Sequence, residues 1–182
     1  MAAIGVFCAS SQRLDAKWLD LAHAVGVELG RRGHMLVSGG GCIGMMGAVA
    51  DGARDAGART LGVMPQSLVD LEIADTAADE LIITSGMAER KTIMIEKSDA
   101  FITLPGGLGT LDELFEVWTT AMLGLHDKPL VVLDTEGFYS GLAEWLRGLV
   151  SRNFVRSEAL SLLLVASDVQ SAFDLLEETW TR

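Results

Sequence analysis

The sequence predicts an α/β protein of the Rossmann-like class, with one doubly wound parallel sheet, helices on both faces, and a single domain over residues 1–182. Two observations lead to this class. Short β-rich runs alternate with longer segments of helical periodicity, which is typical of parallel strands joined by crossover helices. The 182 residues are 49% hydrophobic with three prolines, so the chain can bury one sizeable core, and no stretch looks like a linker.

The predicted strands are short apolar runs that end at glycine, serine, proline or charged residues. In chain order they are IGVFCA, MLVS, TLGV, LIIT, AFITL, LVVL and LLLV, at residues 4–9, 35–38, 60–63, 81–84, 100–104, 130–133 and 162–165. Between and after them, apolar residues recur with helical spacing. The helices that this spacing predicts are residues 16–32, 44–56, 89–97, 111–123, 139–152 and 169–181.

Charge and composition exclude several classes of partner. The net charge is −11 and no basic cluster is present, which argues against a nucleic-acid backbone and favours a small anion bound by backbone amides and a few arginines. No charged, apolar leader precedes Ile4, and no apolar run approaches membrane length, so we expect a cytoplasmic protein without a membrane partner. Cys8 and Cys42, each at the end of a predicted strand, are expected to be buried, reduced thiols.

The most informative segment is PGGLGTLDE, residues 105–113, between a predicted strand and a predicted helix. Gly106, Gly107 and Gly109 lack a Cβ, so the backbone can adopt positive φ and bring N–H groups close to an anion. The helix that follows adds the positive end of its dipole. A phosphate cradle does not need the carboxylate of Glu113 one turn later, and its presence suggests chemistry.

The same residues have a structural interpretation. Thr110-Leu111-Asp112-Glu113 matches a T-x-x-E capping box, in which Thr110 caps the helix and Glu113 folds back onto the Thr110 N–H. Leu111, Leu114, Phe115, Trp118 and Met122 form an apolar stripe, so Glu113 is expected to face a cleft or solvent. Spacing alone leaves both interpretations open.

Two further loops follow predicted strands, where open parallel sheets bind ligands. Ser10 lies in the first, and the second, residues 39–47, contains Gly40 and Gly41 within a weak match to a dinucleotide fingerprint. No Lys-Ser or Lys-Thr pair follows these glycines, so a nucleoside-triphosphate loop is not expected, and a tight structural turn is an equal alternative. Two glycine loops at one sheet edge nonetheless suggest a nucleotide or sugar-phosphate cleft.

Together these motifs closely resemble the Lonely Guy family, many of whose members were labelled lysine decarboxylases. The resemblance runs from about Ile4 to beyond Phe154. It rests on VFCASS, the loop at residues 39–47, Met87-x-x-Arg90-Lys91, SDAF at residues 98–101, the PGGxGTxxE motif, and the LHDKP turn at residues 125–129. It implies a cytokinin riboside 5′-monophosphate phosphoribohydrolase, which splits an N6-modified adenosine monophosphate, or AMP itself, into free base and ribose 5-phosphate. It also implies a homodimer.

Carried over by motif, the resemblance makes Arg90 and Glu113 the catalytic pair. The implied substrate contacts are Glu72, Lys91, Gly106, Gly107, Leu108, Gly109, Thr110, Leu111, Asp112 and Thr119, to which the loops add Ser10, Gly40 and Gly41. Ala88 and Leu108 replace a frequent histidine and a frequent tyrosine of the family, which bears on the base pocket more than on hydrolysis.

The chemistry agrees with these roles, since a carboxylate can stabilise an oxocarbenium-like sugar and activate water without a metal or other cofactor. Whether Arg90 holds phosphate or orients Glu113 stays open. A non-catalytic nucleotide or cofactor carrier of the same fold is the alternative function. A decarboxylase would need pyridoxal phosphate on a lysine, and neither Lys91 nor Lys97 has the sequence context for it.

Overall fold

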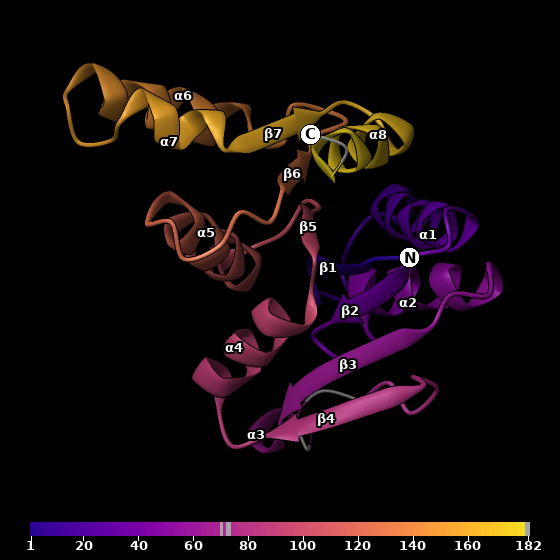
Figure 1. Cartoon of the computed structure of the whole chain (residues 1–182). Helices are drawn as coiled ribbons and strands as arrows, with labels where there is room; N and C mark the ends of the chain where they lie inside the picture. Colours follow the sequence, from indigo (N-terminus) through magenta and orange to yellow (C-terminus); the bar gives the residue numbers. More distant parts are fainter. Residues whose placement is uncertain (70, 72–73, 181–182) are drawn as a thin grey trace.

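The computed structural model describes residues 1–69, 71 and 74–180. In this part of the chain, seven parallel strands form one sheet in the order β4-β3-β2-β1-β5-β6-β7, which confirms the predicted fold class (Figure 1). The strands are β1 (Ala3–Phe7), β2 (Met35–Ser38), β3 (Thr60–Pro65), β4 (Glu80–Thr84), β5 (Ala100–Thr103), β6 (Leu130–Leu133) and β7 (Leu163–Ala166).

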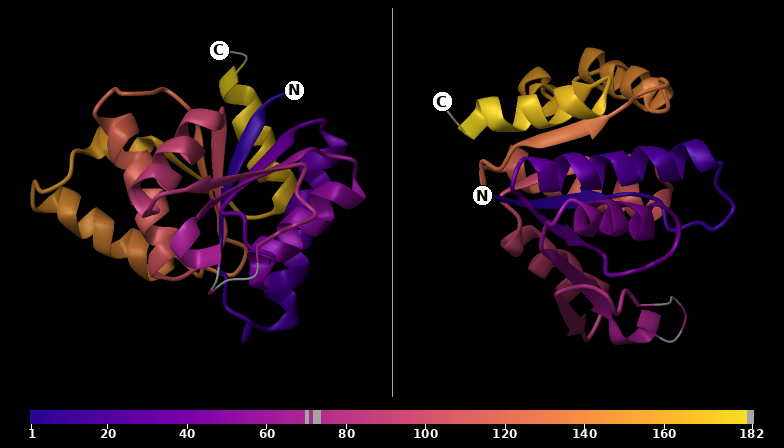
Figure 2. Two further views of the ribbon diagram at one scale, coloured as in Figure 1. Left: turned by 90° about the horizontal axis from the view of Figure 1, so that it is seen from below. Right: turned by 90° about the vertical axis from the view of Figure 1, so that its right-hand side faces the viewer.

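Helices cover both faces of the sheet. One face carries α1 (Ala16–Arg31), α2 (Gly44–Asp55) and α8 (Val169–Trp180), and the other carries α4 (Met87–Lys97), α5 (Leu108–Met122), α6 (Ser140–Ser151) and α7 (Ser157–Ser161) (Figure 1; Figure 2). A short α3 (Gln66–Val69) follows β3. Every predicted strand and helix is present, whereas α3 and α7 were missed because they are too short to show a helical period.

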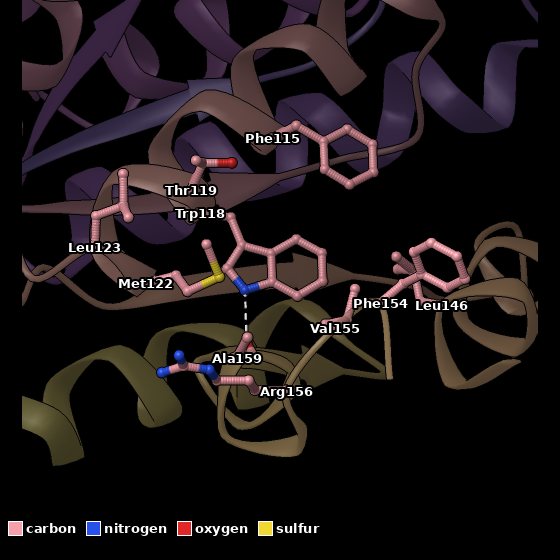
Figure 3. Close-up of a pocket in the computed structure, with 10 residues that line it drawn as sticks. All are labelled: Phe115, Trp118, Thr119, Met122, Leu123, Leu146, Phe154, Val155, Arg156 and Ala159. Carbon is pink, nitrogen blue, oxygen red and sulfur yellow. Dashed lines mark hydrogen bonds between the residues drawn. The ribbon is translucent and has the colours of Figure 1, made fainter. Parts of the chain in front are cut away.

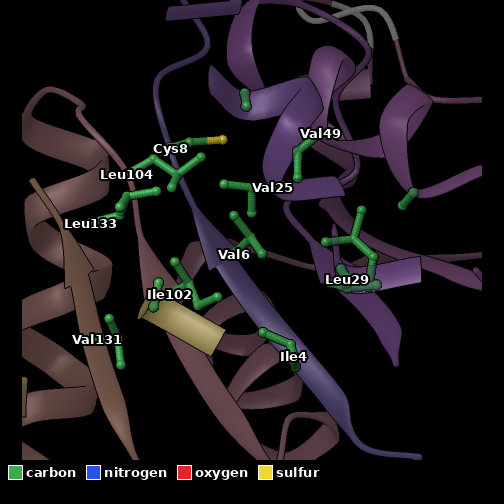
Figure 4. Close-up of a cluster of buried hydrophobic side chains, with 14 of the residues drawn as sticks. Ile4, Val6, Cys8, Val25, Leu29, Val49, Ile102, Leu104, Val131 and Leu133 are labelled. Atoms are coloured by element: carbon green, nitrogen blue, oxygen red, sulfur yellow. The ribbon is translucent and has the colours of Figure 1, made fainter. Parts of the chain in front are cut away.

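The core lies on both faces because successive strand residues point to opposite sides. Figure 4 shows one half, where Ile4 and Val6 of β1 pack with Val25 and Leu29 of α1 and with Val49 of α2. The other half is a cluster of strand residues with α4, α5 and α6, formed by Phe7, Val37, Leu61, Val63, Met94, Phe101, Val117, Trp118, Leu130 and Leu146.

The direction in which the chain crosses the sheet reverses between β1 and β5. These two strands are neighbours, with Phe7 opposite Thr103, although about a hundred residues of other strands and helices separate them in sequence. At such a switch point the loops after the two strands diverge to opposite faces and leave a crevice at the carboxyl edge. The loop after β1 and the glycine loop after β5 therefore face a common space.

None of the helices that the structure describes combines the length and the apolar character needed to cross a bilayer.

Candidate active site

A cavity of about 340 Å³ opens at this switch point. Its wall combines the loop after β1, the glycine loop with the first turns of α5, one side chain each from α2 and α3, and two from α4. The lining residues are Cys8, Ala9, Ser10, Ser11, Met46, Leu68, Met87, Arg90, Gly107, Leu108, Gly109, Thr110 and Glu113. Seven of them were predicted as site residues, namely Ser10, Arg90, Gly107, Leu108, Gly109, Thr110 and Glu113.

The N-terminus of α5 forms one wall. Gly107 is the N-cap residue, and no side chain caps the helix there. The first helical hydrogen bond runs from the Leu111 N–H to the Gly107 carbonyl at 3.0 Å, so the N–H groups of Leu108, Gly109 and Thr110 precede the first hydrogen-bonded turn. Amides in this position, together with the helix dipole, make an anion site.

The glycines of this loop act differently from the prediction. None of Gly106, Gly107 and Gly109 has positive φ in the structure. A Cβ on Gly106 would overlap the Thr110 side chain, whereas a Cβ on Gly107 or Gly109 would meet no atom within 4 Å. Gly106 therefore permits close packing, and the other two leave the space in front of the helix open to a ligand.

The capping interpretation of Glu113 is wrong. Because α5 begins at Leu108, three residues before the predicted start, Thr110 is the third helical residue and Glu113 the sixth. Thr110 is buried and is not the N-cap residue. A glutamate in the second turn has no cap to complete, and Glu113 instead lines the cavity, as the alternative interpretation predicted.

Arg90 meets Glu113 from the opposite wall. Its Nη2 lies 3.8 Å from Glu113 Oε1 and donates to the Gly39 carbonyl at 3.3 Å. The arginine is only 6% exposed, and its Nε has no hydrogen-bond partner among the described residues. Gly39 makes this position possible, because a Cβ there would overlap Nη2. Gly39, in the loop after β2, thus holds the guanidinium beside the carboxylate in two ways: its carbonyl accepts a hydrogen bond, and its lack of a side chain leaves room for Nη2.

Lys91, predicted as a substrate contact, does not reach the cavity. Its Nζ lies 2.6 Å from Glu116 Oε2 and 3.0 Å from Asp112 Oδ2. The hydrogen bond to Glu116, the largest cause, and that to Asp112 raise the pKa of Lys91 above its ordinary value, although burial opposes the rise. The ammonium group therefore links α4 to α5 next to the catalytic candidates, because Lys91 follows Arg90 and Asp112 precedes Glu113 in sequence.

The two thiols differ. Cys8 is buried, as expected, and lines the cavity, where burial and then the charge of Glu113 raise the pKa of its thiol far above the usual range. Cys8 therefore stays neutral. Cys42 is exposed, contrary to the expectation, because it follows the isolated bridge at Gly41 and lies outside any strand.

Several predicted contacts lie outside the cavity wall. Gly40 is held at a φ of 76°, and Gly41 pairs with Ala74. Neither lines the cavity, and the same is true of Gly106, Leu111 and Asp112. Glu72 lies outside the described residues. Ala88 is exposed and also absent from the wall.

Sequence reasoning missed the apolar part of the wall. Met46, Leu68 and Met87 line the cavity from three different helices. Met87 lies in the motif that carries the family resemblance and could have been selected on that ground. Leu68 has no such signal, because it lies on α3, which the sequence did not predict.

Thr119 belongs to a second hollow, an apolar groove of about 440 Å³ between α5 and the segment from α6 to α7. Figure 3 shows Trp118 at its base, with Nε1 donating to the Ala159 carbonyl at 2.7 Å. The other lining residues are Phe115, Thr119, Met122, Leu123, Leu146, Phe154, Val155, Arg156 and Ala159. Phe154 is 73% exposed.

Comparisons with known proteins agree with these features. The family described as "Possible lysine decarboxylase" matches residues 46–176. A cytokinin riboside 5′-monophosphate phosphoribohydrolase of Mycobacterium tuberculosis is 50% identical over 169 residues, which are 93% of this chain and 90% of the relative. A protein of the same name from Oryza sativa subsp. japonica is 41% identical over 175 residues, 96% of this chain and 72% of the relative. Among solved structures, the molybdenum cofactor carrier protein of Chlamydomonas reinhardtii has a TM-score of 0.74 at 25% identity and covers 100% of this chain and 99% of its own.

Proposed function

This chain belongs to the Lonely Guy family, and on that premise we propose that it hydrolyses the N-glycosidic bond of an N6-modified adenosine 5′-monophosphate to the free base and ribose 5-phosphate. One observation carries the proposal. The uncapped N-terminus of α5 and the Arg90 and Glu113 pair open into the same cavity. An anion site and a carboxylate suited to glycosidic chemistry are thus combined on one helix.

The spacing along α5 suits a sugar phosphate. Glu113 follows Leu108 by five residues, which corresponds to about 7.5 Å of helix rise. A phosphate at the N–H groups of Leu108, Gly109 and Thr110 would place the attached ribose along the helix, with its anomeric carbon toward Glu113. Binding of the non-reacting phosphate would then fix the reacting bond against the carboxylate.

Bond cleavage needs one group to stabilise a cation and one to activate water. As the bond to the base breaks, positive charge develops on the ribose, and the Glu113 carboxylate would stabilise it electrostatically. The same carboxylate would take a proton from the water that attacks the anomeric carbon. The base would leave with the bonding electron pair and take a proton from solvent, and Glu113 would release to solvent the proton it took from water, which yields free base and ribose 5-phosphate.

Arg90 is better placed to orient Glu113 than to hold phosphate. Its guanidinium is buried, anchored on the Gly39 carbonyl, and directed at the carboxylate. Lys91 would act indirectly. Its ion pairs with Asp112 and Glu116 would fix α4 against α5, the two helices that carry Arg90 and Glu113. The distance between the Arg90 guanidinium and the Glu113 carboxylate would then stay fixed.

The base would meet apolar side chains. Met46, Leu68, Met87 and Leu108 line the cavity, and Leu108 is 87% exposed at its mouth. A purine with an apolar N6 substituent would bury these groups, whereas AMP would leave part of them in water. We therefore expect the modified nucleotide to be preferred to AMP.

Turnover of N6-isopentenyl AMP tests the proposal, with free base measured by chromatography and ribose 5-phosphate by a coupled assay. AMP and the two corresponding nucleosides are the comparison substrates. Monophosphates should be cleaved and nucleosides should not, because only the former occupy the anion site. A similar kcat/KM for nucleoside and nucleotide would contradict the phosphate role of α5.

A homodimer is part of the proposal. The apolar groove of Figure 3 is flanked by Met122, Leu123 and Phe154, all exposed in the single chain. Thr119 lines this groove and not the cavity, so it could contact substrate only in an assembly that brings it to a site. A second copy seated on the groove accounts for both observations.

Light scattering at micromolar concentration should give a dimer mass. Phe154→Arg should lower that mass toward the monomer, because the charge would be placed in the apolar interface. Trp145→Arg is the matched control, since Trp145 is 59% exposed yet does not line the groove. A monomer mass for the unmodified protein would contradict the dimer.

A carrier function is the second candidate, favoured by the likeness to the molybdenum cofactor carrier protein. A carrier would bind its ligand in the same cavity without consuming it. Stoichiometric binding of N6-isopentenyl AMP without release of base would support a carrier and contradict the hydrolase. The lysine decarboxylase description of the family has weaker support, because no lysine is among the described residues that line the cavity, and Lys91 is paired with Asp112 and Glu116.

A further inference from the structure

Tyr139 contacts the start of the glycine loop but does not line the cavity. It is the N-cap residue of α6, and its hydroxyl donates to the Leu104 carbonyl at 2.7 Å. The backbone N–H of Gly106 interacts with the same phenol oxygen. A hydroxyl can donate one hydrogen bond and accept others, so this single group serves both sides of Pro105, which has no N–H of its own.

The ring of Tyr139 is buried in the core. It is 7% exposed and belongs to a buried cluster with Leu114 of α5 and Val132 of β6. Leu111 packs against that cluster from the first turns of α5. The side chain therefore contacts both the segment that leads into α5 and the buried face of α5 itself.

The two contacts of the Tyr139 hydroxyl, with Leu104 and Gly106, form a bridge whose position in the chain suggests its role. The Leu104 N–H donates to the Phe7 carbonyl at 2.9 Å, so Leu104 is fixed to the sheet edge. Gly106 directly precedes Gly107, the N-cap of α5. The phenol thus contacts Leu104, which is bonded to β1, and Gly106, which precedes the N-cap of α5. These contacts set where the N-terminus of α5 lies relative to β1.

We infer that Tyr139 is a positioning residue for substrate phosphate, which acts by holding the loop of Leu104, Pro105 and Gly106 so that the α5 amides face the cavity in a fixed geometry. Its side chain does not line the cavity. The substrate part of this inference rests on the proposed function, whereas the effect on the loop does not. Burial raises the pKa of Tyr139 well above its usual range and the Gly106 N–H only partly offsets this, so the phenol stays protonated and keeps its bond to Leu104.

Tyr139→Phe removes one oxygen and keeps the packing. Without the hydroxyl, amide hydrogen exchange in residues 104–111 should speed up by about tenfold or more, because the buried Leu104 carbonyl loses its hydrogen-bond partner. KM for N6-isopentenyl AMP and Ki for ribose 5-phosphate should rise together by about tenfold, with kcat changed by less than about threefold. Adenine should inhibit both proteins equally, since it lacks the phosphate.

Ser98→Ala is the matched control. Ser98 is buried, and its hydroxyl donates to the Met94 carbonyl at 2.8 Å, just before β5 at the opposite edge of the sheet. It should lower thermal stability without changing exchange in residues 104–111 or the affinity for ribose 5-phosphate. If Tyr139→Phe behaves like this control, the positioning role is refuted and Tyr139 is a packing residue only.

Two measurements do not depend on turnover. The chain has one tyrosine, so the near-ultraviolet absorbance of tyrosinate reports this residue alone. The folded protein should show no rise near pH 10, the ordinary value for a free phenol. A rise there while the protein stays folded would overturn the bridge. If no nucleotide is cleaved, the proposed function fails, whereas the exchange and absorbance results still decide the effect of Tyr139 on the loop.

Discussion

Glu113→Gln is the sharpest test of the site, because the amide keeps the size of the side chain and removes only its charge. The Glu113 side chain is 11% exposed and lies 3.8 Å from a guanidinium. At that separation, and with the effective dielectric constant of about 20 that suits such sites, the pair interacts by about 4 kcal/mol before desolvation is counted. Much of this is offset by the cost of burying the two charges.

Two effects follow and can be measured separately. The amide leaves the buried Arg90 guanidinium without its carboxylate counter-ion, so we expect the free energy of unfolding to fall by roughly 1–3 kcal/mol. An amide cannot balance the charge of an oxocarbenium-like sugar or take a proton from water, so kcat should fall by roughly two to four orders of magnitude. Thermal denaturation gives the first effect, and initial rates on saturating N6-isopentenyl AMP give the second.

Glu116→Gln is the matched control for this variant. Glu116 lies on the same helix and loses the same charge, but it pairs with Lys91 and does not line the cavity. Its kcat should stay within about threefold of the unmodified enzyme, since Asp112 still binds Lys91. If Glu113→Gln keeps more than about a tenth of kcat, a loss below about 1.4 kcal/mol in the barrier, Glu113 is a counter-ion for Arg90 and not a catalytic group.

Three further outcomes are expected. Gly39→Ala should lower kcat by about tenfold or more, because the added methyl group would occupy the space of the Arg90 guanidinium. Unchanged activity would show that catalysis does not require Arg90 in this position. A thiol reagent should modify Cys42 rapidly in the native protein and Cys8 only on unfolding, so two fast thiols would contradict the burial of Cys8. Burial lowers the pKa of His126, so the unfolded chain binds its proton first, and stability should fall as the pH drops below about 6.5. Urea unfolding should show a smaller fall for His126→Gln.

The fold could be predicted because each strand and helix has a period that depends only on neighbouring residues. β2 and β6 begin and end where the sequence predicted, and the other strands differ by one or two residues at their ends. The ends of helices are less certain, since a cap depends on contacts that periodicity does not report. That uncertainty mattered at α5, where a start at Leu108 instead of residue 111 removed the capping role of Thr110.

The sequence by itself also determined which residues we propose for the chemistry, because Arg90, the glycine loop and Glu113 form a recognisable pattern. Only the tertiary structure decided how they are combined. The pairing of β1 with β5 brings Ser10 beside the glycine loop, and side-chain packing directs Lys91 toward Asp112 and away from the cavity. These are contacts between residues far apart in the chain, and neither composition nor spacing along one segment contains the three-dimensional distances that set them.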